Sequence, residues 1–194
     1  MNWLTAYRAD VRRYTAYGES GALRQMLTQQ GLWALLQYRL ASAVYQSSLP
    51  GLLKRPLLLL MVVWQKLIEI TAGICLPYTA QIGAGLYIGH FGHIILNSGV
   101  VMGSECNLSQ GVTIGVSGRG ERRGVPVIGD RVYFGANATV AGRICVGDDA
   151  VIGANSLVTS DVPDGCTVVG VPAEIVSRRG SQDYIQPLSQ YRAR

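Results

Sequence analysis

Two histidines, His90 and His93, are the side chains of this sequence best suited to acid–base chemistry. They lie three residues apart in the segment Ile88-Gly-His-Phe-Gly-His-Ile94. An imidazole takes up a proton from a hydroxyl group near neutral pH, which is the task of a general base. A histidine is nevertheless more often structural than catalytic, so the elements that carry this pair decide whether it faces a site.

A period of six residues organises the chain from Leu76 to Pro163. Every sixth residue is apolar, and glycine often follows it. These positions are Leu76, Ile82, Ile88, Ile94, Val100, Cys106 and Val112, then Ile128, Phe134, Val140, Val146, Ile152 and Val158. A helical face would show apolar residues three and four apart, and each glycine would destabilise a helix by roughly 1 kcal/mol relative to alanine. The period therefore predicts a mainly β solenoid of short strands and tight turns, with three units in each coil.

This register also predicts where the histidines point. His90 and His93 lie two and five positions after the inward residue Ile88. Neither occupies an inward position, so we expect both imidazoles on the surface rather than in the core. A surface position leaves two alternatives, a solvated histidine or a histidine that belongs to a site.

Residues 1–74 have a different pattern. Apolar residues recur at helical spacing over residues 31–45 and 57–70, with a break at Lys54-Arg55-Pro56, which predicts two or three helices. We therefore divide the chain into a helical N-terminal region at 1–74, a solenoid domain at 75–176 and a C-terminal tail at 177–194.

The apolar stretch at 56–64 is too short to span a bilayer, which takes about 20 residues. Lys54, Arg55 and Lys66 flank it, as basic residues flank a helix that lies flat on a membrane surface. The competing interpretation, which the sequence favours, is a helix packed on the solenoid or on a neighbouring subunit.

The repeat is interrupted once, between Val112 and Ile128. The insert at 117–125 is polar and rich in glycine, and it carries Arg119, Arg122 and Arg123. Loops that interrupt a solenoid project from a corner and usually lie on its binding face. The insert is therefore a candidate part of a binding site, the alternative being a solvated loop.

The composition of the chain indicates which class of partner it binds and in which cellular compartment it works. The net charge is +5, but the basic residues are dispersed and no aromatic residues alternate with them, which argues against nucleic acid and favours anionic small molecules. The four cysteines have no C-x-x-C spacing, so we predict neither disulfides nor a bound metal. Arg8, Asp10, Arg12 and Arg13 occupy the place of an apolar signal core. We expect a cytoplasmic protein, with peripheral contact at the inner face of the membrane as an alternative.

Three segments and the insert resemble the serine acetyltransferase family of hexapeptide-repeat acyltransferases. The segments are Gly85-Leu-Tyr-Ile-Gly-His90, Asn107-Leu-Ser-Gln-Gly-Val-Thr-Ile-Gly115 and Val168-Val-Gly-Val-Pro-Ala173. The resemblance covers residues 74–176 and is closest to the branch found in exopolysaccharide and colanic-acid gene clusters. It implies a left-handed parallel β-helix, a homotrimer, acetyl-CoA in a groove between adjacent β-helices, and active sites shared between two subunits.

The resemblance also implies roles for particular residues. His90 matches the catalytic base that deprotonates the acceptor hydroxyl. The acceptor-binding candidates are His93, Phe91, Arg122 and Arg123, and the candidates for binding acetyl-CoA are Gly115, Ala136, Ala154, Thr159, Ser160, Arg178 and Arg179. The last two could pair with phosphate, because guanidinium groups match phosphate geometry, or simply form a basic tail.

Three positions depart from the family pattern. Cys75 replaces a carboxylate that orients the base, Gly89 replaces an aspartate that contacts the amino-acid substrate, and a loop histidine is replaced near Arg123 and Gly124. A site for a zwitterion needs a carboxylate for the ammonium group, since a buried unpaired charge is costly. We therefore expect the acceptor to be a sugar of an exopolysaccharide or capsule repeat unit, or its lipid-linked precursor. Serine O-acetylation is the alternative, and a non-catalytic scaffold is the second alternative.

Overall fold

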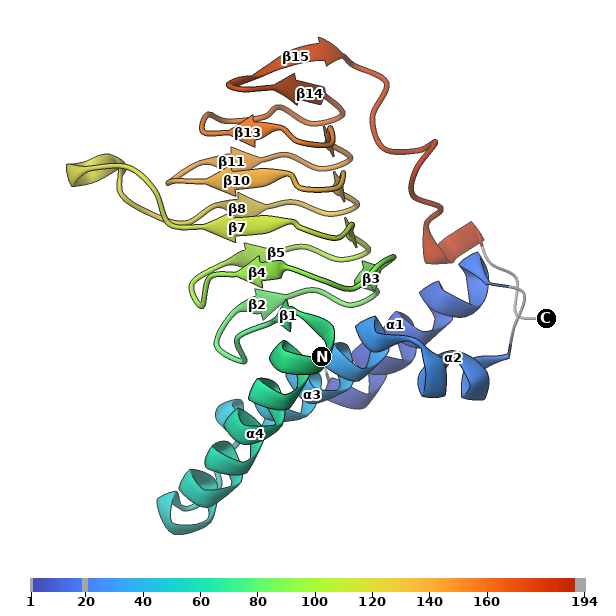
Figure 1. Cartoon of the computed structure of the whole chain (residues 1–194), viewed down its shortest axis with the longest axis vertical. Helices are drawn as coiled ribbons and strands as arrows, with labels where there is room; N and C mark the ends of the chain where they lie inside the picture. The colour runs from blue at the N-terminus through green and yellow to red at the C-terminus, as the bar shows by residue number, and fades with distance from the viewer. Residues whose placement is uncertain (1, 19–20, 191–194) are drawn as a thin grey trace.

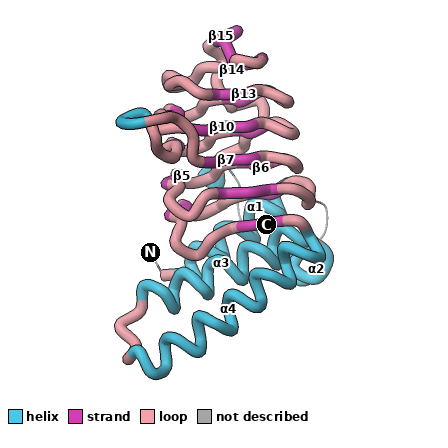
Figure 2. Tube along the Cα trace, turned by 60° about the vertical axis from the view of Figure 1, so that its left-hand side comes forward, coloured by secondary structure: helices cyan, strands magenta, loops and turns pink. Residues whose placement is uncertain are grey.

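A base of helices carries a column of stacked β coils (Figure 1). The computed structural model describes residues 2–18 and 21–190. The helices are α1 (Trp3–Tyr17), α2 (Ala22–Thr28), α3 (Gln30–Gln46) and α4 (Gly51–Ala72), and short 3-10 turns lie at Gly120–Arg122 and Leu188–Gln190. Figure 2 shows α3 and α4 side by side beneath the coils.

The helical region confirms the helix predicted over residues 31–45, which is α3, but it departs from the prediction in two other respects. The described residues contain four helices before the first strand rather than two or three, and α4 begins at Gly51, so the predicted break at 54–56 is wrong. Pro56 lies inside α4 and deprives the carbonyl of Leu52 of its helical donor. Leu52 is 88% exposed, so solvent can replace that hydrogen bond.

The strands form three sheets, one on each side of the solenoid. Sheet A contains β1 (Ile74–Cys75), β4 (Ile94–Leu96), β7 (Thr113–Gly115), β10 (Thr139–Ala141) and β13 (Leu157–Val158). Sheet B contains β2 (Gln81–Ile82), β5 (Val101–Met102), β8 (Val127–Ile128) and β11 (Cys145–Val146). Sheet C contains β3 (Tyr87–Ile88), β6 (Asn107–Leu108), β9 (Tyr133–Phe134), β12 (Val151–Ile152), β14 (Thr167–Gly170) and β15 (Ala173–Ser177). All pairs are parallel except β14 with β15, which is antiparallel.

Each coil passes from sheet A to sheet B to sheet C and then to sheet A of the next coil. The turns therefore stack into three columns, which we call the A–B corner, the B–C corner and the C–A corner. The thirteen positions predicted to point inward are all buried, at 8% exposure or less. The predicted register and the mainly β solenoid fold are confirmed.

A buried ion pair joins the helices to the first coil. Asp10 of α1 is fully buried and accepts hydrogen bonds from Nε and Nη2 of Arg39 in α3, at 2.9 and 3.0 Å. The same carboxylate accepts from the backbone N–H groups of Gly85 and Leu86, at 2.8 and 3.0 Å. Arg39 in turn donates to two carbonyl groups of the preceding strand and turn. The donors and acceptors of this junction thus come from the two helices, from β2 and from the turn that follows it.

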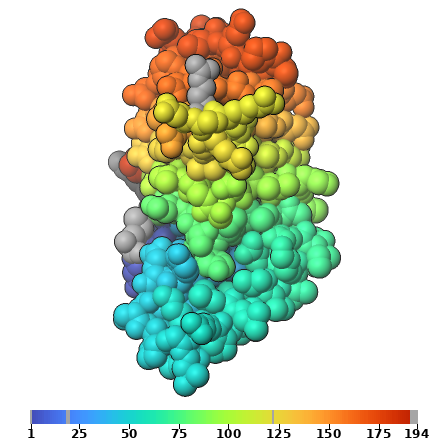
Figure 3. Space-filling model, turned by 90° about the vertical axis from the view of Figure 1, so that its left-hand side faces the viewer, coloured from blue at the N-terminus to red at the C-terminus, as the bar shows by residue number. Residues whose placement is uncertain are grey.

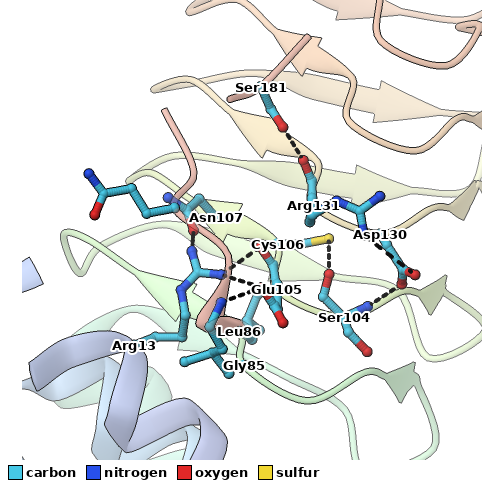
Figure 4. Close-up of polar contacts among 12 residues, drawn as sticks. Arg13, Gly85, Leu86, Ser104, Glu105, Cys106, Asn107, Asp130, Arg131 and Ser181 are labelled. Carbon is cyan, nitrogen blue, oxygen red and sulfur yellow. Dashed lines mark hydrogen bonds and ion pairs between the residues drawn. The ribbon is translucent and has the colours of Figure 1, made fainter. Parts of the chain in front are cut away.

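The C-terminal segment 181–190 returns along sheet C to α1 (Figure 1). The ring of Tyr184 stacks on Tyr133 of β9, with 4.6 Å between ring centroids, and its carbonyl accepts from the hydroxyl of Tyr17. Figure 4 shows the hydrogen bond from Ser181 to the carbonyl of Arg131 that begins this return. The segment and α1 together cover part of the outer face of sheet C, while Val169 of β14 and Ile175 of β15 stay exposed.

The Asp10–Arg39 pair provides a stability test. Replacing Asp10 by alanine leaves a buried guanidinium without its carboxylate, so we expect Asp10→Ala to lower the free energy of unfolding by about 3–5 kcal/mol. Thermal unfolding at matched protein concentration measures this, and Asp183→Ala removes an exposed carboxylate as the control. Equal effects of the two substitutions would contradict the assigned role of the pair.

Candidate active site

The two histidines lie on the C–A corner between β3 and β4. His90, Phe91 and His93 are exposed, as the register predicted. His93 has a positive φ of 54°, and Gly92 before it has a φ of 107°, so the turn is tight. Neither imidazole has a hydrogen-bond partner within the described residues. The base candidate is therefore open to an external ligand.

A buried tyrosine fixes the strand that leads to His90. The hydroxyl of Tyr14 in α1 donates to the carbonyl of Ile88 at 3.0 Å and accepts from its N–H at 3.1 Å. Complete burial raises the pKa of Tyr14 well above its ordinary value, so its hydroxyl stays protonated and can donate. The ring of Tyr14 also packs against Tyr87, 4.7 Å between centroids. Helix α1 thus sets the position of the backbone two residues before His90.

The C-terminal end of α4 touches the same corner. Gly73 caps α4 with a φ of 64°, and its carbonyl accepts from the N–H of Ile94 at 2.9 Å. A Cβ atom added at Gly73 would lie 2.9 Å from the backbone nitrogen of His93, so only glycine fits without displacing the turn. The histidine turn is therefore held from two sides, by α1 and by the end of α4.

Two of the candidates for binding acetyl-CoA share the column of turns with His90. Ala136 follows β9 and Ala154 follows β12, both on the C–A corner, and the carbonyl of Ala136 accepts from the N–H of Asn155 at 2.8 Å. The turn at residues 171–172, between β14 and β15, closes this column at its upper end. The structure therefore brings His90, Ala136 and Ala154 onto one edge of the solenoid.

The insert and three other candidates lie on the opposite edge of sheet A. Gly115 ends β7, and Thr159 and Ser160 follow β13, all at the A–B corner. The insert leaves the same corner as a hairpin closed by Ser117 and Gly124, whose backbones exchange two hydrogen bonds of 3.1 Å (Figure 1). Figure 3, which views the molecule from that side, shows the insert in front of the coils because it projects outward from them. Within one chain, the width of sheet A separates these residues from His90.

The remaining candidates are the basic residues of the insert and of the C-terminal tail. Arg123 is exposed on the insert at the A–B corner, while the side chain of Arg122 lies outside the described part of the structure. Arg178 and Arg179 are exposed after β15, which runs back toward the B–C corner, where the N–H of Gly180 bonds to the carbonyl of Gly165 at 2.8 Å. The structure thus separates Arg178 and Arg179 from the column that carries His90.

Sequence reasoning missed a carboxylate beside Cys75. Glu69, in the last turns of α4, makes a hydrogen bond with the Cys75 thiol. Gln65 donates to Glu69 Oε1 at 2.9 Å and to Cys75 Sγ at 3.7 Å. Burial and then the neighbouring Glu69 raise the pKa of Cys75 to about 11. Partial burial opposes ionisation of Glu69, but the hydrogen bonds from Lys66, Cys75 and Gln65 lower its pKa overall. The only signal in the sequence was helical spacing, which places Gln65, Glu69 and Gly73 on one side of α4.

Other features do not add to this corner. A cavity of about 380 Å³ lies between α1, α3 and sheet B, lined by Trp3, Tyr38 and Arg39 among others, but Arg39 is already paired there. All four cysteines are free thiols, and two of them, Cys106 and Cys166, are buried. In the described ranges, no group of three His, Cys, Asp or Glu side chains is arranged to hold a metal ion.

Comparisons with known proteins agree with the fold and identify relatives. Residues 126–160 match the family model "Bacterial transferase hexapeptide (six repeats)". The serine acetyltransferase of Helicobacter pylori strain J99 is 37% identical over 153 residues, which are 79% of this chain and 85% of that protein. A Neisseria gonorrhoeae serine acetyltransferase solved in complex with serine has a TM-score of 0.77 and 31% identity, over 90% of this chain and 69% of that chain. A serine acetyltransferase solved in complex with CoA has a TM-score of 0.75 and 27% identity, over 90% of this chain and 70% of that chain.

These relatives correct the predicted acceptor. The expectation of a sugar acceptor rested on the residues at positions 75 and 89 and on the missing loop histidine. The relatives named above are serine acetyltransferases, and none of the comparisons supports the exopolysaccharide branch. Although position 75 is a cysteine, Glu69 of α4 supplies a negative charge beside it. The prediction of a sugar acceptor is therefore wrong.

The contact between Glu69 and Cys75 is testable through the reactivity of the thiol. In Glu69→Gln the neighbouring negative charge is gone, so we expect the pKa of Cys75 to fall from about 11 and its alkylation at pH 8 to become several-fold faster. Iodoacetamide labelling, read by peptide mass spectrometry in a Cys145→Ser background, measures the rate without the exposed thiol. Glu174→Gln, which neutralises an exposed carboxylate on β15, should leave the rate unchanged. An unchanged rate in Glu69→Gln would contradict the contact.

Proposed function

The chain belongs to the serine acetyltransferase family of hexapeptide-repeat acyltransferases, and on that basis we propose that it transfers the acetyl group of acetyl-CoA to the hydroxyl group of serine. The observation that carries the proposal is the exposed His90 on the C–A corner, in one column with Ala136 and Ala154. The relatives solved with serine and with CoA have the same fold over about nine tenths of this chain.

In the proposed reaction, His90 acts as the general base. Its imidazole accepts the proton of the serine hydroxyl, and the oxygen attacks the thioester carbonyl of acetyl-CoA. The carbon–sulfur bond then breaks, and the departing thiolate of CoA takes up the proton from the imidazolium. The products are O-acetylserine and CoA, so no redox partner or metal enters the reaction.

The division of the candidates between two corners supports a site shared by neighbouring copies. His90 lies on the C–A corner, and Arg123 lies on the A–B corner across sheet A. We propose a homotrimer in which the C–A corner of one copy faces the A–B corner and insert of the next. Acetyl-CoA would then run between Ala136 and Ala154 on one side and Gly115, Thr159 and Ser160 on the other. Family resemblance favours the same assembly.

The proposed shared site gives each of the three parts of the chain a role. In this proposal the solenoid at 75–176, with its insert at 117–125, carries the reaction, and the helical region at 1–74 holds the histidine turn in place through Tyr14 and Gly73. The tail at 177–194 begins at the end of β15 and, through its described part, covers part of sheet C. Serine would meet the exposed side chains of Phe91 and His93 beside the base.

The role of His90 is tested by turnover. We expect His90→Ala to lower kcat for serine acetylation by about 10²- to 10⁴-fold, because general-base assistance is lost. Thiol release from acetyl-CoA gives the rate, and mass spectrometry identifies O-acetylserine as the product. His93→Ala, three residues away, should change KM for serine more than kcat. Serine-dependent turnover that survives His90→Ala, or wild-type enzyme that releases thiol only with other acceptors, would contradict the proposal.

The shared site is tested by mixing two defective chains. We expect His90→Ala and Arg123→Ala each to be impaired alone, and co-expression of both to restore activity, because about one site in three of each mixed trimer then combines an intact His90 with an intact Arg123 from the neighbour. The restored fraction is measured on purified mixed trimers carrying two different affinity tags. Activity no higher than that of the two separate variants would show that each site lies within one chain.

A further inference from the structure

Helix α4 leaves a large apolar surface uncovered. Eight of its apolar side chains are between 37% and 88% exposed. We call them the α4 apolar face, and they are Leu52, Leu53, Leu57, Leu59, Leu60, Val63, Leu67 and Ile70. Together they amount to roughly five fully exposed large aliphatic side chains, or on the order of 500 Å² of apolar surface. Patches of this size on a soluble chain mark interaction sites.

The spacing of these residues shows that the face is continuous. Leu52, Leu59, Val63 and Ile70 recur at intervals that return to the same side of a helix, and the others flank them. The opposite side of α4 is already used: Ile68 and Ala72 are buried, and the carbonyl of Met61 accepts from Gln37 of α3 at 3.0 Å. Packing against α3 therefore explains only one side of this amphipathic helix.

The charge of the helical region indicates the chemistry of the partner. Residues 21–68 contain no Asp or Glu and five basic residues, which are Arg24, Arg39, Lys54, Arg55 and Lys66. Arg39 is neutralised by Asp10, and Lys66 pairs with Glu69. Lys54 and Arg55, beside the start of the apolar face, have no carboxylate partner in the described part of the chain. Arg55 is exposed, while Lys54 is partly buried and its ammonium group donates to the carbonyl of Ser47 at 2.9 Å, near the ring of Tyr45. A surface that offers both apolar chains and negative charge complements this end of α4.

A second copy of the chain fits this surface poorly. It would bring Lys54 and Arg55 against another helical region that has no acidic residue between positions 21 and 68. An anionic phospholipid surface instead offers acyl chains to the leucines and phosphate groups to the two basic side chains. No helix of the described residues is long and apolar enough to cross a membrane.

We propose that α4 docks on an anionic phospholipid membrane surface, with its apolar face inserted at the acyl boundary and with Lys54 and Arg55 against the headgroups. The position of α4 permits this contact. Figures 1 and 2 show the α3–α4 end at the far side of the helical base from the coils, and Figure 3 shows it as the lower margin of the molecule. The solenoid therefore does not stand between this end of the molecule and a flat surface. The proposal does not depend on which acceptor the enzyme uses.

Vesicle flotation of the full chain tests the proposal. With vesicles of phosphatidylcholine and phosphatidylglycerol in a 7:3 ratio, chosen as about one third anionic lipid, we expect the wild-type protein to float. With phosphatidylcholine alone it should stay in the dense fraction. Leu59→Gln/Val63→Gln should lower the partition coefficient about tenfold or more by removing apolar contact. Lys54→Gln/Arg55→Gln should lower it by about 30-fold, an effect that added salt reproduces in the wild type.

The matched control is Leu23→Gln. Leu23 is 73% exposed on α2, away from the α3–α4 end, so its replacement should leave flotation unchanged. Circular dichroism and sedimentation velocity without lipid accompany each variant. The proposal would be overturned if the wild-type protein floated with neither kind of vesicle. It would also be overturned if the Leu59→Gln/Val63→Gln variant floated like the wild type. A smaller oligomer in that double variant would overturn it too, by showing that another copy covers the face.

Discussion

The structure depends on how the first coil of the solenoid is closed from below, because its backbone groups have no coil beneath them. A parallel β coil leaves unpaired N–H and C=O groups at each end, and these groups are costly when they are buried. The Asp10–Arg39 pair satisfies four of them in one turn. Tyr38 bridges the carbonyl of Ala80 and the N–H of Ile82, and Tyr14 does the same at Ile88. The helices are therefore a cap specific to this coil rather than a separate attachment.

That cap also determines the geometry of the candidate site. Tyr14 fixes Ile88, which lies two residues before His90, and Gly73 at the end of α4 contacts the backbone of His93. Helix α1, which helps α3 to satisfy the lower edge, thus also holds the turn that carries the base, together with the end of α4. A change at Asp10, far from His90 in sequence, is for this reason expected to act on the site through the position of α1. The stability of the cap and the geometry of the base are coupled.

The sequence predicts this molecule well wherever the pattern is local and repeated. Six-residue spacing predicted every inward position and the exposure of both histidines, and the same register places Ala136 and Ala154 on the corner of His90. It could not predict contacts such as that of Asp10 with Gly85, because single long-range hydrogen bonds leave no period. The break expected near Pro56 failed because the helix start there is exposed and tolerates a lost hydrogen bond. The acceptor prediction failed because it compared residues position by position, whereas the carboxylate near Cys75 comes from Glu69 on another element.

The exposed face of α4 is a consequence of the same capping function. Once Ile68 and Ala72 are turned inward toward the cap, the leucines on the other side of the helix must face outward, because a helix that packs on one side cannot bury both. Gly73 then joins α4 to the histidine turn with a left-handed backbone and a close contact that leaves no room for a side chain. Rotation of α4 relative to the coils would therefore displace His93. Any surface on which α4 rests thus meets the solenoid at one fixed inclination, and the column of turns above His90 keeps the same orientation to that surface.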